Sequence, residues 1–216
     1  MQILRNLGDK LDPTLACLLV VDVQNDFCSP QGAIARRGGD VTSSVEMVSR
    51  LVHLIEESRK VRLPIIYIKT IHSNWTDTPA WLYRKPEGID LETCREGTWG
   101  TEFFGGIAPL PDERVIIKHR YSAFIHTDLN TALRAKGVES VLVTGVATNV
   151  CVETTARDAF MYDYYVTMVE DCVATSDNAL HVATLENMRR HFGLVVSSRE
   201  IIAAWQGLPQ KKTAAL

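Results

Sequence analysis

The chain has 216 residues, of which 46% are hydrophobic and 23% charged, a composition typical of a globular protein with a substantial core. Its 23 basic and 26 acidic residues give a formal net charge of −3, so nothing predicts a basic surface for nucleic acid or anionic lipid. No apolar run approaches the ~20 residues that span a bilayer, and the first 15 residues carry charges where a signal peptide would be apolar. We expect a cytoplasmic protein whose partner is a small molecule, with neither nucleic acid nor membrane.

The cysteines argue against a disulfide framework or a structural zinc site. Their number is odd and none forms a CxxC pair, the spacing common to zinc knuckles and redox motifs. Some of these thiols are therefore expected to be small buried hydrophobes. The five are Cys17, Cys28, Cys94, Cys151 and Cys172.

Apolar segments of strand length alternate with amphipathic segments of helical length. Continuous apolar strands separated by helices predict a parallel sheet covered on both faces. The sequence therefore predicts an α/β fold, a single three-layer αβα domain over residues 1–216 with a six-stranded parallel sheet. The expected strands cover 16–23, 64–70, 114–118, 140–146, 164–170 and 194–196.

Helix boundaries are predicted from capping signals. Ser43 followed by Glu46 forms a capping-box pattern ahead of an amphipathic stretch. Thr127 is expected to cap another helix, which Gly137 would end. A further helix is predicted over 177–192.

One segment, residues 72–112, lacks clear periodicity and is rich in Trp, Gly and Pro. So long an irregular insertion in a compact domain is usually functional. It is expected to be a lid, with Trp99 or Phe103 closing a site, or a subunit contact; a surface excursion packed by its own aromatics is the alternative. The tail, 207–216, has little apolar content and is predicted to be disordered or to reach across an interface.

Three reactive side chains fall at the carboxyl ends of predicted strands, where open parallel sheets bind ligands. Asp22 ends the first strand, Lys118 ends the third, and Cys151 follows the fourth. Singly, each has an ordinary alternative. Asp22 could cap a turn or accept a phosphoryl group, Lys118 could be a surface lysine, and Cys151 could be a core residue.

Together they indicate nucleophilic catalysis. A cysteine at a strand–helix junction lies near a helix N-terminus, which favours the thiolate, and a nearby ammonium would lower the thiol pKa further. A carboxylate can take the thiol proton and pass it to a leaving amine. Backbone amides between Gly145 and Cys151 could face an oxyanion.

Three motifs carry a family resemblance: LLVVDVQNDFC (18–28), KHRYSAF (118–124) and VTGVATNVCVETTARDAF (143–160). In their order and spacing the chain resembles the isochorismatase-like cysteine hydrolases from about residue 14 to 200. The resemblance implies the six-stranded fold, a homo-oligomer such as a dimer or tetramer, and a catalytic triad. That triad maps onto Asp22, Lys118 and Cys151.

The resemblance also implies an oxyanion hole beside a cis peptide bond. The bond would join Val146 to Ala147, and the donors would be the amides of Ala147 and Cys151. Outside proline, such bonds are rare in proteins.

Differences from relatives narrow the expected activity. After the second strand, nicotinamidases carry an Asp-x-His pair and a further His that bind a metal. This chain has KTIHSNWTDT with His72 alone, so we expect no metal and no cofactor. True isochorismatases, which cleave a vinyl ether, lack the nucleophilic cysteine. The motifs are most similar to the ureidoacrylate amidohydrolase branch, related to biuret, triuret and N-carbamoylsarcosine hydrolases, which implies cleavage of a carbamoyl or ureido C–N bond.

Neighbours of the reactive residues in the sequence are candidate substrate contacts. The asparagines could bond a urea-like group or cap turns, and the aromatic rings could stack on it or pack in the core. The candidates are Asn25, Phe27, Tyr121, Phe124 and Asn149. Two other functions stay open: hydrolysis of another small amide, ester or ring on the same fold, and a non-enzymatic thiol sensor.

Overall fold

The computed structural model of the protein describes residues 3–84 and 90–207. All six strands are parallel and form one sheet in the order β3-β2-β1-β4-β5-β6. This confirms the predicted fold class. The strands are β1 (Ala16–Val21), β2 (Ile65–Thr70), β3 (Arg114–Lys118), β4 (Ser140–Val146), β5 (Tyr165–Ala174) and β6 (Gly193–Val196).

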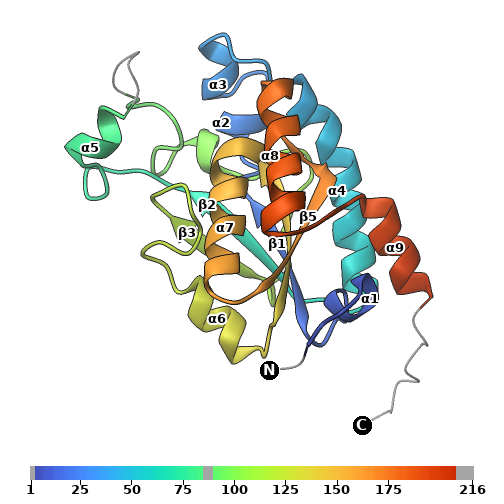
Figure 1. The fold of residues 1–216 in the computed structure, drawn as a ribbon. Coiled ribbons are helices and arrows are strands. Elements are labelled where there is room, and N and C mark those ends of the chain that lie inside the picture. The colour runs from blue at the N-terminus through green and yellow to red at the C-terminus, as the bar shows by residue number, and fades with distance from the viewer. Residues whose placement is uncertain (1–2, 85–89, 208–216) are drawn as a thin grey trace.

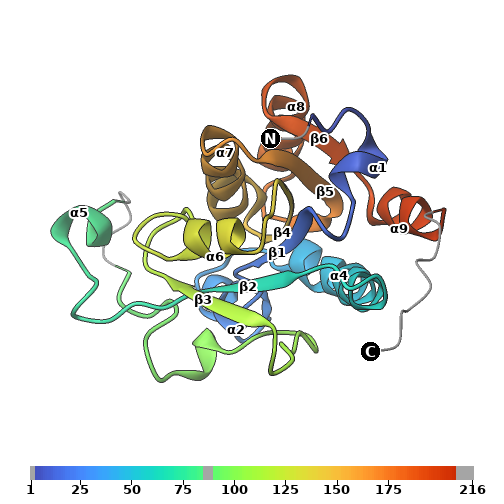
Figure 2. The same ribbon diagram turned by 90° about the horizontal axis from the view of Figure 1, so that it is seen from below.

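Helices cover both faces of the sheet, as Figures 1 and 2 show. α4 (Thr42–Lys60) and α9 (Ser198–Gln206) lie on one face. α6 (Leu129–Ala135), α7 (Glu153–Met161) and α8 (Asn178–His191) lie on the other. The short elements are α1 (Leu7–Lys10), α2 (Asn25–Cys28), α3 (Ala33–Arg36), α5 (Pro79–Leu82), the 3₁₀ turn η1 (Trp99–Thr101) and the π turn η2 (Thr148–Val152).

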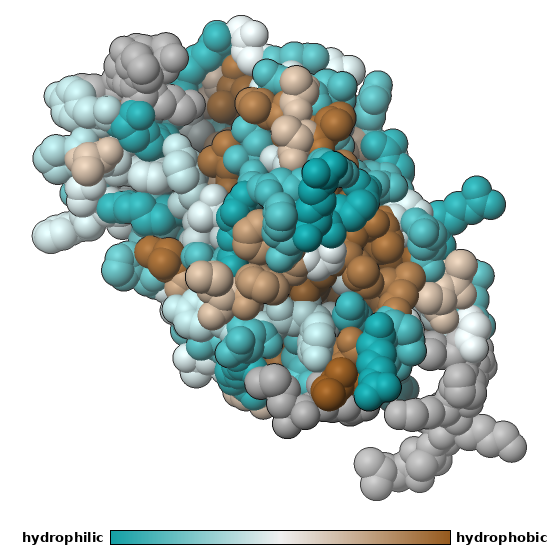
Figure 3. Space-filling view, in the orientation of Figure 1, coloured by the Kyte–Doolittle hydropathy of each residue, from teal (hydrophilic) through white to brown (hydrophobic). Residues whose placement is uncertain are grey.

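The central strand β1 supplies both layers of the core. Leu18 and Val20 belong to the cluster under α4 and α9, whereas Leu19 and Val21 belong to the cluster under α6, α7 and α8. Successive side chains of a strand point to opposite faces, so a continuous apolar strand fits only a sheet covered on both sides. The covering helices keep polar side chains outward, and the face that carries α7 and α8 is largely hydrophilic with separate apolar areas (Figure 3).

Helix starts are where the sequence predictions and the structure differ most. The capping box at Ser43 and Glu46 is wrong: α4 begins at Thr42, whose amide bonds the Asp40 carboxylate at 2.8 Å. Ser43 instead donates to the carbonyl of Thr175 at 2.8 Å, a partner 132 residues away. At the start of α6 the Thr127 hydroxyl does accept the Leu129 amide, at 3.2 Å. The last helix, α9, was not predicted, although Ser197 and Glu200 form its capping box.

The insertion over 72–112 leaves the body of the domain after β2 and carries α5 to its outer edge (Figures 1 and 2). Three consecutive residues that follow Asp22, namely Gln24, Asn25 and Asp26, bind the second half of the insertion. Gln24 Nε2 donates to the Thr101 carbonyl and Asn25 Nδ2 to the Trp99 carbonyl, each at 2.9 Å, and the Asp26 carboxylate accepts the Cys94 amide at 2.7 Å. The insertion is therefore attached directly to the chain beside Asp22.

Two further predictions concern the C-terminal tail and membrane-spanning segments. The tail prediction for 207–216 lies outside the described residues beyond Gly207. Within residues 3–84 and 90–207, no helix combines the length and the apolar character needed to cross a bilayer.

Candidate active site

The carboxyl ends of four neighbouring strands bring the three reactive residues together. Asp22 follows β1, Lys118 is the last residue of β3, and Cys151 lies in η2, one turn beyond β4. β2 separates β1 from β3 in the sheet, and its last residue, Thr70, fills the gap between their ends. The side chains meet because parallel strands end at one common edge.

Lys118 is the centre of the cluster. Its Nζ lies 2.7 Å from Asp22 Oδ2, 2.7 Å from Thr70 Oγ1 and 3.5 Å from Cys151 Sγ, and it also donates to the Arg120 carbonyl at 3.0 Å. The ammonium thus bridges the carboxylate and the thiol.

Within the part of the chain that the structure describes, one carboxylate oxygen of Asp22 accepts a hydrogen bond, whereas the other does not. Thr70 Oγ1 donates to Oδ1 at 3.0 Å, whereas Oδ2 accepts no well-formed hydrogen bond from any described residue and has only its ion pair with Lys118. The backbone at Asp22 is left-handed, with φ of 54°, which turns the chain sharply at the end of β1. Oδ2 is the atom with free capacity to accept a proton.

Thr70 and Gln24 belong to this site although the sequence analysis did not select them. Thr70 bonds Lys118 and Asp22 through one hydroxyl. Gln24 holds Thr70 from both sides of its backbone, accepting its amide at 2.7 Å and donating to its carbonyl at 2.9 Å. The strand-end rule that selected Lys118 could have found Thr70, whereas the role of Gln24 depends on pairing between distant segments.

Burial decides the protonation states. Asp22 and Lys118 are fully buried, whereas Cys151 is 8% exposed. Burial raises the pKa of Cys151 to about 12, against the opposing effect of Lys118. Lys118 lowers this pKa, as expected, but desolvation is the larger effect and favours the neutral thiol. For Lys118 burial disfavours the charge, but Asp22 and Cys151 outweigh it and the pKa rises.

The loop that carries Cys151 has an unusual backbone. The peptide bond between Val146 and Ala147 is cis, and Gly145 has φ of 107°. A Cβ on Gly145 would lie 1.9 Å from the Val21 carbonyl oxygen, so only glycine lets β4 approach β1 at this point. The Ala147 carbonyl accepts the amides of Val150 and Val152, at 3.0 and 3.2 Å, which closes η2 behind the thiol.

The five candidate substrate contacts take different places. Phe124 is buried and packs against Tyr162 and Tyr164, so it has the core role that the sequence left open. Asn25 is buried and its amide holds the Trp99 carbonyl, which makes it an anchor of the insertion. The remaining three are half-buried: Phe27, Tyr121 and Asn149.

Asn149 lies two residues before Cys151 in the chain, and Tyr121 lies three residues after Lys118. The Asn149 side-chain oxygen accepts the Thr175 hydroxyl at 2.8 Å, which orients its amide. Tyr121 packs against Trp81, with ring centroids 4.9 Å apart, and Trp81 also packs against His72 at 5.2 Å. Trp81 is thus an insertion aromatic that packs against a residue three positions after Lys118 in the chain, whereas the closing role predicted for Trp99 or Phe103 stays a prediction.

His72 is a packing residue in this structure. It is buried against Trp81, and burial lowers its pKa to about 4. The imidazole is therefore neutral near pH 7.

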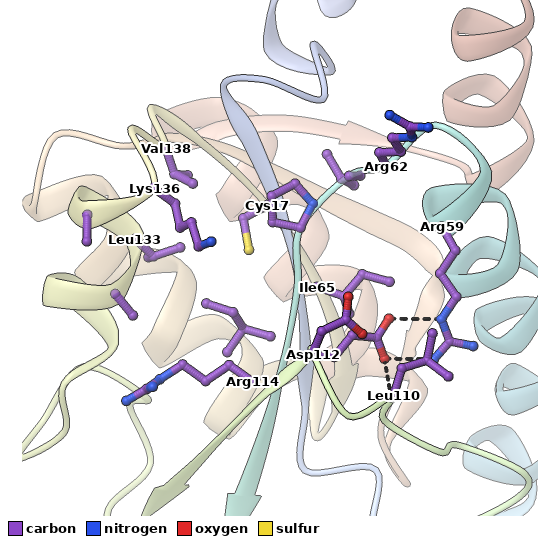
Figure 4. A pocket seen from close by; sticks show the side chains of 16 residues that line it. Cys17, Arg59, Arg62, Ile65, Leu110, Asp112, Arg114, Leu133, Lys136 and Val138 are labelled. Atoms are coloured by element: carbon purple, nitrogen blue, oxygen red, sulfur yellow. Dashed lines mark hydrogen bonds and ion pairs between the residues drawn. The ribbon is translucent and has the colours of Figure 1, made fainter. Parts of the chain in front are cut away.

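A large cavity lies at the opposite end of the sheet, away from the cluster. It has a volume of about 710 Å³ and is bounded by the starts of β2 and β3 and the end of α6, with Cys17 on its floor (Figure 4). Cys17 is fully buried, and burial raises its thiol pKa. The Cys17 sulfur donates to the Leu18 carbonyl at 3.7 Å, whereas the Cys151 sulfur lies 3.5 Å from Lys118 Nζ.

Known proteins resemble the chain over nearly its whole length. It is 32% identical to the ureidoacrylate amidohydrolase RutB of Methylobacterium radiotolerans, over 94% of this chain and 84% of that protein. Among solved structures, a cysteine hydrolase from Pseudomonas syringae pv. phaseolicola has a TM-score of 0.81 at 27% identity, covering 95% of this chain and 98% of that one. The N-carbamoylsarcosine amidase of Thermoplasma acidophilum has a TM-score of 0.70 at 28% identity, covering 85% and 96%.

The family model described as the isochorismatase domain matches residues 16–200, a span that contains the whole sheet and the complete cluster. The chain therefore belongs to the isochorismatase domain family.

Proposed function

We propose that the protein is a cysteine amidohydrolase that cleaves the C–N bond of a small carbamoyl or ureido amide, such as ureidoacrylate, biuret or triuret. The observation that carries the proposal is the buried contact of Lys118 Nζ with both Asp22 and Cys151. Relatives named as amidohydrolases along almost the whole chain place it among hydrolases of non-peptide C–N bonds.

The first half of the reaction uses the neutral resting thiol. Asp22 Oδ2 takes the proton from Cys151 as the sulfur attacks the substrate carbonyl carbon, and Lys118 stabilises the developing negative charge. The carbonyl oxygen becomes an oxyanion, which the amides of Ala147 and Cys151 receive. When the tetrahedral intermediate collapses, its C–N bond breaks and the leaving amine takes the proton from Asp22. A carbamoyl or acyl group remains on the sulfur.

The second half returns the enzyme to its starting state. Asp22 removes a proton from water, whose oxygen attacks the thioester carbon. The C–S bond then breaks, Cys151 regains its proton, and a carbamate or acid is released. No step needs a metal or a cofactor, because the base, the cation and the nucleophile are side chains of this cluster.

The decisive measurement is ammonia release from ureidoacrylate, biuret, triuret, N-carbamoylsarcosine and nicotinamide, with and without chelator. We expect turnover of a ureido substrate that survives the chelator and falls at least ~10⁴-fold in Cys151→Ala. Cys172→Ala is the matched control: this thiol is also buried, with a pKa raised to about 12 by burial, but it lies in β5 outside the cluster. Rapid quenching should trap the carbamoyl or acyl adduct on Cys151.

A different result would redirect the proposal. If none of the five compounds releases ammonia while Cys151 is still alkylated, the chain is a hydrolase of an ester or ring, or a thiol sensor. Reversible oxidation of Cys151 without turnover would favour the sensor.

We further propose that the enzyme works as a cytoplasmic homo-oligomer. All five cysteines are free thiols, which suits a reducing compartment. The oligomer rests on the family resemblance, and sedimentation velocity that finds only a monomer would contradict it.

A further inference from the structure

Two guanidinium groups lie around one indole ring beside the reactive cluster. The Cζ atoms of Arg84 and Arg120 are 3.9 and 5.1 Å from the centroid of the Trp81 ring. Arg84 comes from the insertion and Arg120 from the segment that follows β3. Stacking on an aromatic face removes part of the hydration of a guanidinium while leaving its N–H edge open for hydrogen bonds.

Both arginines are tied to the residues next to Lys118. The Arg120 carbonyl accepts a hydrogen bond from Lys118 Nζ at 3.0 Å, so its backbone contacts the reactive cluster directly. Arg84 Nε donates to the hydroxyl of Tyr121 at 2.8 Å, and Tyr121 packs against Trp81. The guanidinium groups are thereby held at the side of the cluster on which the insertion lies.

Among the described residues, neither guanidinium has a carboxylate partner as close as those of two other arginines. Arg95 pairs with Asp77 at 2.7 Å, and Arg37 pairs with Asp90 at 2.7 Å. Arg84 reaches that same Asp90 only at 4.0 Å.

The hydrogen bonds of the pair point to the same conclusion. Besides Tyr121, Arg84 donates to the Trp81 carbonyl at 2.6 Å, and Arg120 donates to the carbonyls of Thr76 and His119, at 3.2 and 2.6 Å. Within residues 3–84 and 90–207, neither guanidinium donates to a carboxylate. Neutral acceptors orient a guanidinium but do not neutralise it, so Arg120, and Arg84 apart from its 4.0 Å ion pair with Asp90, keep positive charge for an anion.

We propose that Arg84 and Arg120 form a carboxylate subsite, so that the preferred substrate is a ureido acid rather than a neutral biuret or triuret. The inference rests on the proposed function for the cleaved bond and adds the group that the enzyme recognises. Asp22 and Lys118 cancel one another and the Cys151 thiol is neutral, so the reactive cluster has no net charge of its own. The two guanidinium groups add positive charge beside this cluster and attract a carboxylate carried a few bonds from the ureido carbonyl.

The test compares ureidoacrylate with its methyl ester, with ammonia released from the ureido end as the readout for both. In the wild type we expect kcat/KM to be higher for the acid than for the ester. Arg84→Met and Arg120→Met should each lower the ratio of the two values by about 10- to 100-fold, mainly through KM of the acid, because a hydrogen bond to a charged group is lost. Arg84→Lys should restore part of the ratio, since it returns the charge without the forked geometry.

Arg134→Met is the matched control. Arg134 also stacks on an aromatic ring, with its Cζ 4.3 Å from the centroid of Tyr164, and it donates to the carbonyl of Tyr162. It lies on α6, and its removal should leave the acid-to-ester ratio at the wild-type value. The subsite is overturned if the wild type cleaves the ester as readily as the acid, or if both arginine variants keep the wild-type ratio.

Binding to Cys151→Ala protein separates this inference from the proposed function. Calorimetric titration with the acid and the ester needs no turnover. If the wild type hydrolyses no urea but the Cys151→Ala protein prefers the acid, and Arg84→Met abolishes that preference, the subsite stands and the proposed reaction fails. If ureas are hydrolysed but the Cys151→Ala protein binds both compounds equally, the reaction stands and the subsite fails.

Discussion

At the scale of single residues, the reactive cluster is organised around the three N–H donors of the Lys118 ammonium. Thr70 Oγ1 and Asp22 Oδ2 lie at 2.7 Å and the Arg120 carbonyl at 3.0 Å, whereas the Cys151 sulfur is more distant at 3.5 Å. Two hydrogen bonds and the ion pair with Asp22 therefore fix the ammonium, and the thiol is its most distant contact. This arrangement suits a charge that acts most strongly once the sulfur becomes negative.

Thr70→Val should separate the positioning of this cluster from its chemistry. The change removes the hydroxyl that accepts from Lys118 and donates to Asp22, so we expect kcat to fall by up to ~10²-fold through misplacement. The unpaired buried groups should also lower the free energy of unfolding by about 1–3 kcal/mol. Steady-state kinetics and urea unfolding measure the two effects, and Thr70→Ser, which keeps the hydroxyl, is the control. Wild-type kcat in Thr70→Val would contradict the role.

At the scale of elements, the edge where β1 and β4 end is set by a close backbone approach. Gly145 lies opposite Val21 in the parallel ladder, and the pairing of β4 with β5 shifts register beside it. Asp22 follows one of these strands and the loop carrying Cys151 follows the other. The separation of the carboxylate from the thiol therefore depends on how closely the two strands pack.

Gly145→Ala should be among the most damaging single changes in the sheet. The new Cβ would meet the Val21 carbonyl oxygen at 1.9 Å, at φ of 107°, where side chains are disfavoured. We expect the free energy of unfolding to fall by more than about 4 kcal/mol, measured by urea unfolding. Gly207→Ala, whose Cβ would have its nearest contact at 3.6 Å, is the control. A loss below about 1 kcal/mol would show that the strands can separate.

At the scale of the whole molecule, the two ends of the sheet have different roles. The carboxyl ends carry the buried ionic cluster and the insertion that lies beside it, whereas the opposite end carries the cavity over Cys17. The reactive end concentrates buried polar groups that are individually costly. Their titration couples the stability of the entire fold to pH.

His72 allows the dependence of stability on pH to be tested on the acidic side. Burial lowers its pKa from 6.5 to about 4, so the unfolded chain binds the proton more readily than the folded protein. The stabilisation is therefore complete above about pH 6.5 and is lost as the pH falls toward 4, with a slope of at most ~1.4 kcal/mol per pH unit. His72→Phe keeps the ring against Trp81 and should flatten this part of the curve. Urea unfolding from pH 4 to 7 measures both proteins, and parallel curves would contradict the assignment.

The sequence predicted the architecture because its strands are apolar without interruption. A strand such as β1 can be buried on both faces only in a covered parallel sheet, and the ends of such strands share one edge. The shared edge predicts that Asp22, Lys118 and Cys151 lie close together, and the structure brings their side chains together. Apolar runs of strand length predicted all six strands, although β5 runs four residues beyond its predicted end.

Only the tertiary structure decided the contacts between residues far apart in the chain. Ser43 bonds Thr175 instead of capping its own helix, and Phe124 packs in the core. Thr70 contacts Asp22 and Lys118, each of which is 48 residues away in the sequence. The protonation state of Cys151 was likewise set by burial, which local sequence does not report. Local pattern fixes which face of an element is apolar, whereas the partner of each polar group depends on where the fold places distant segments.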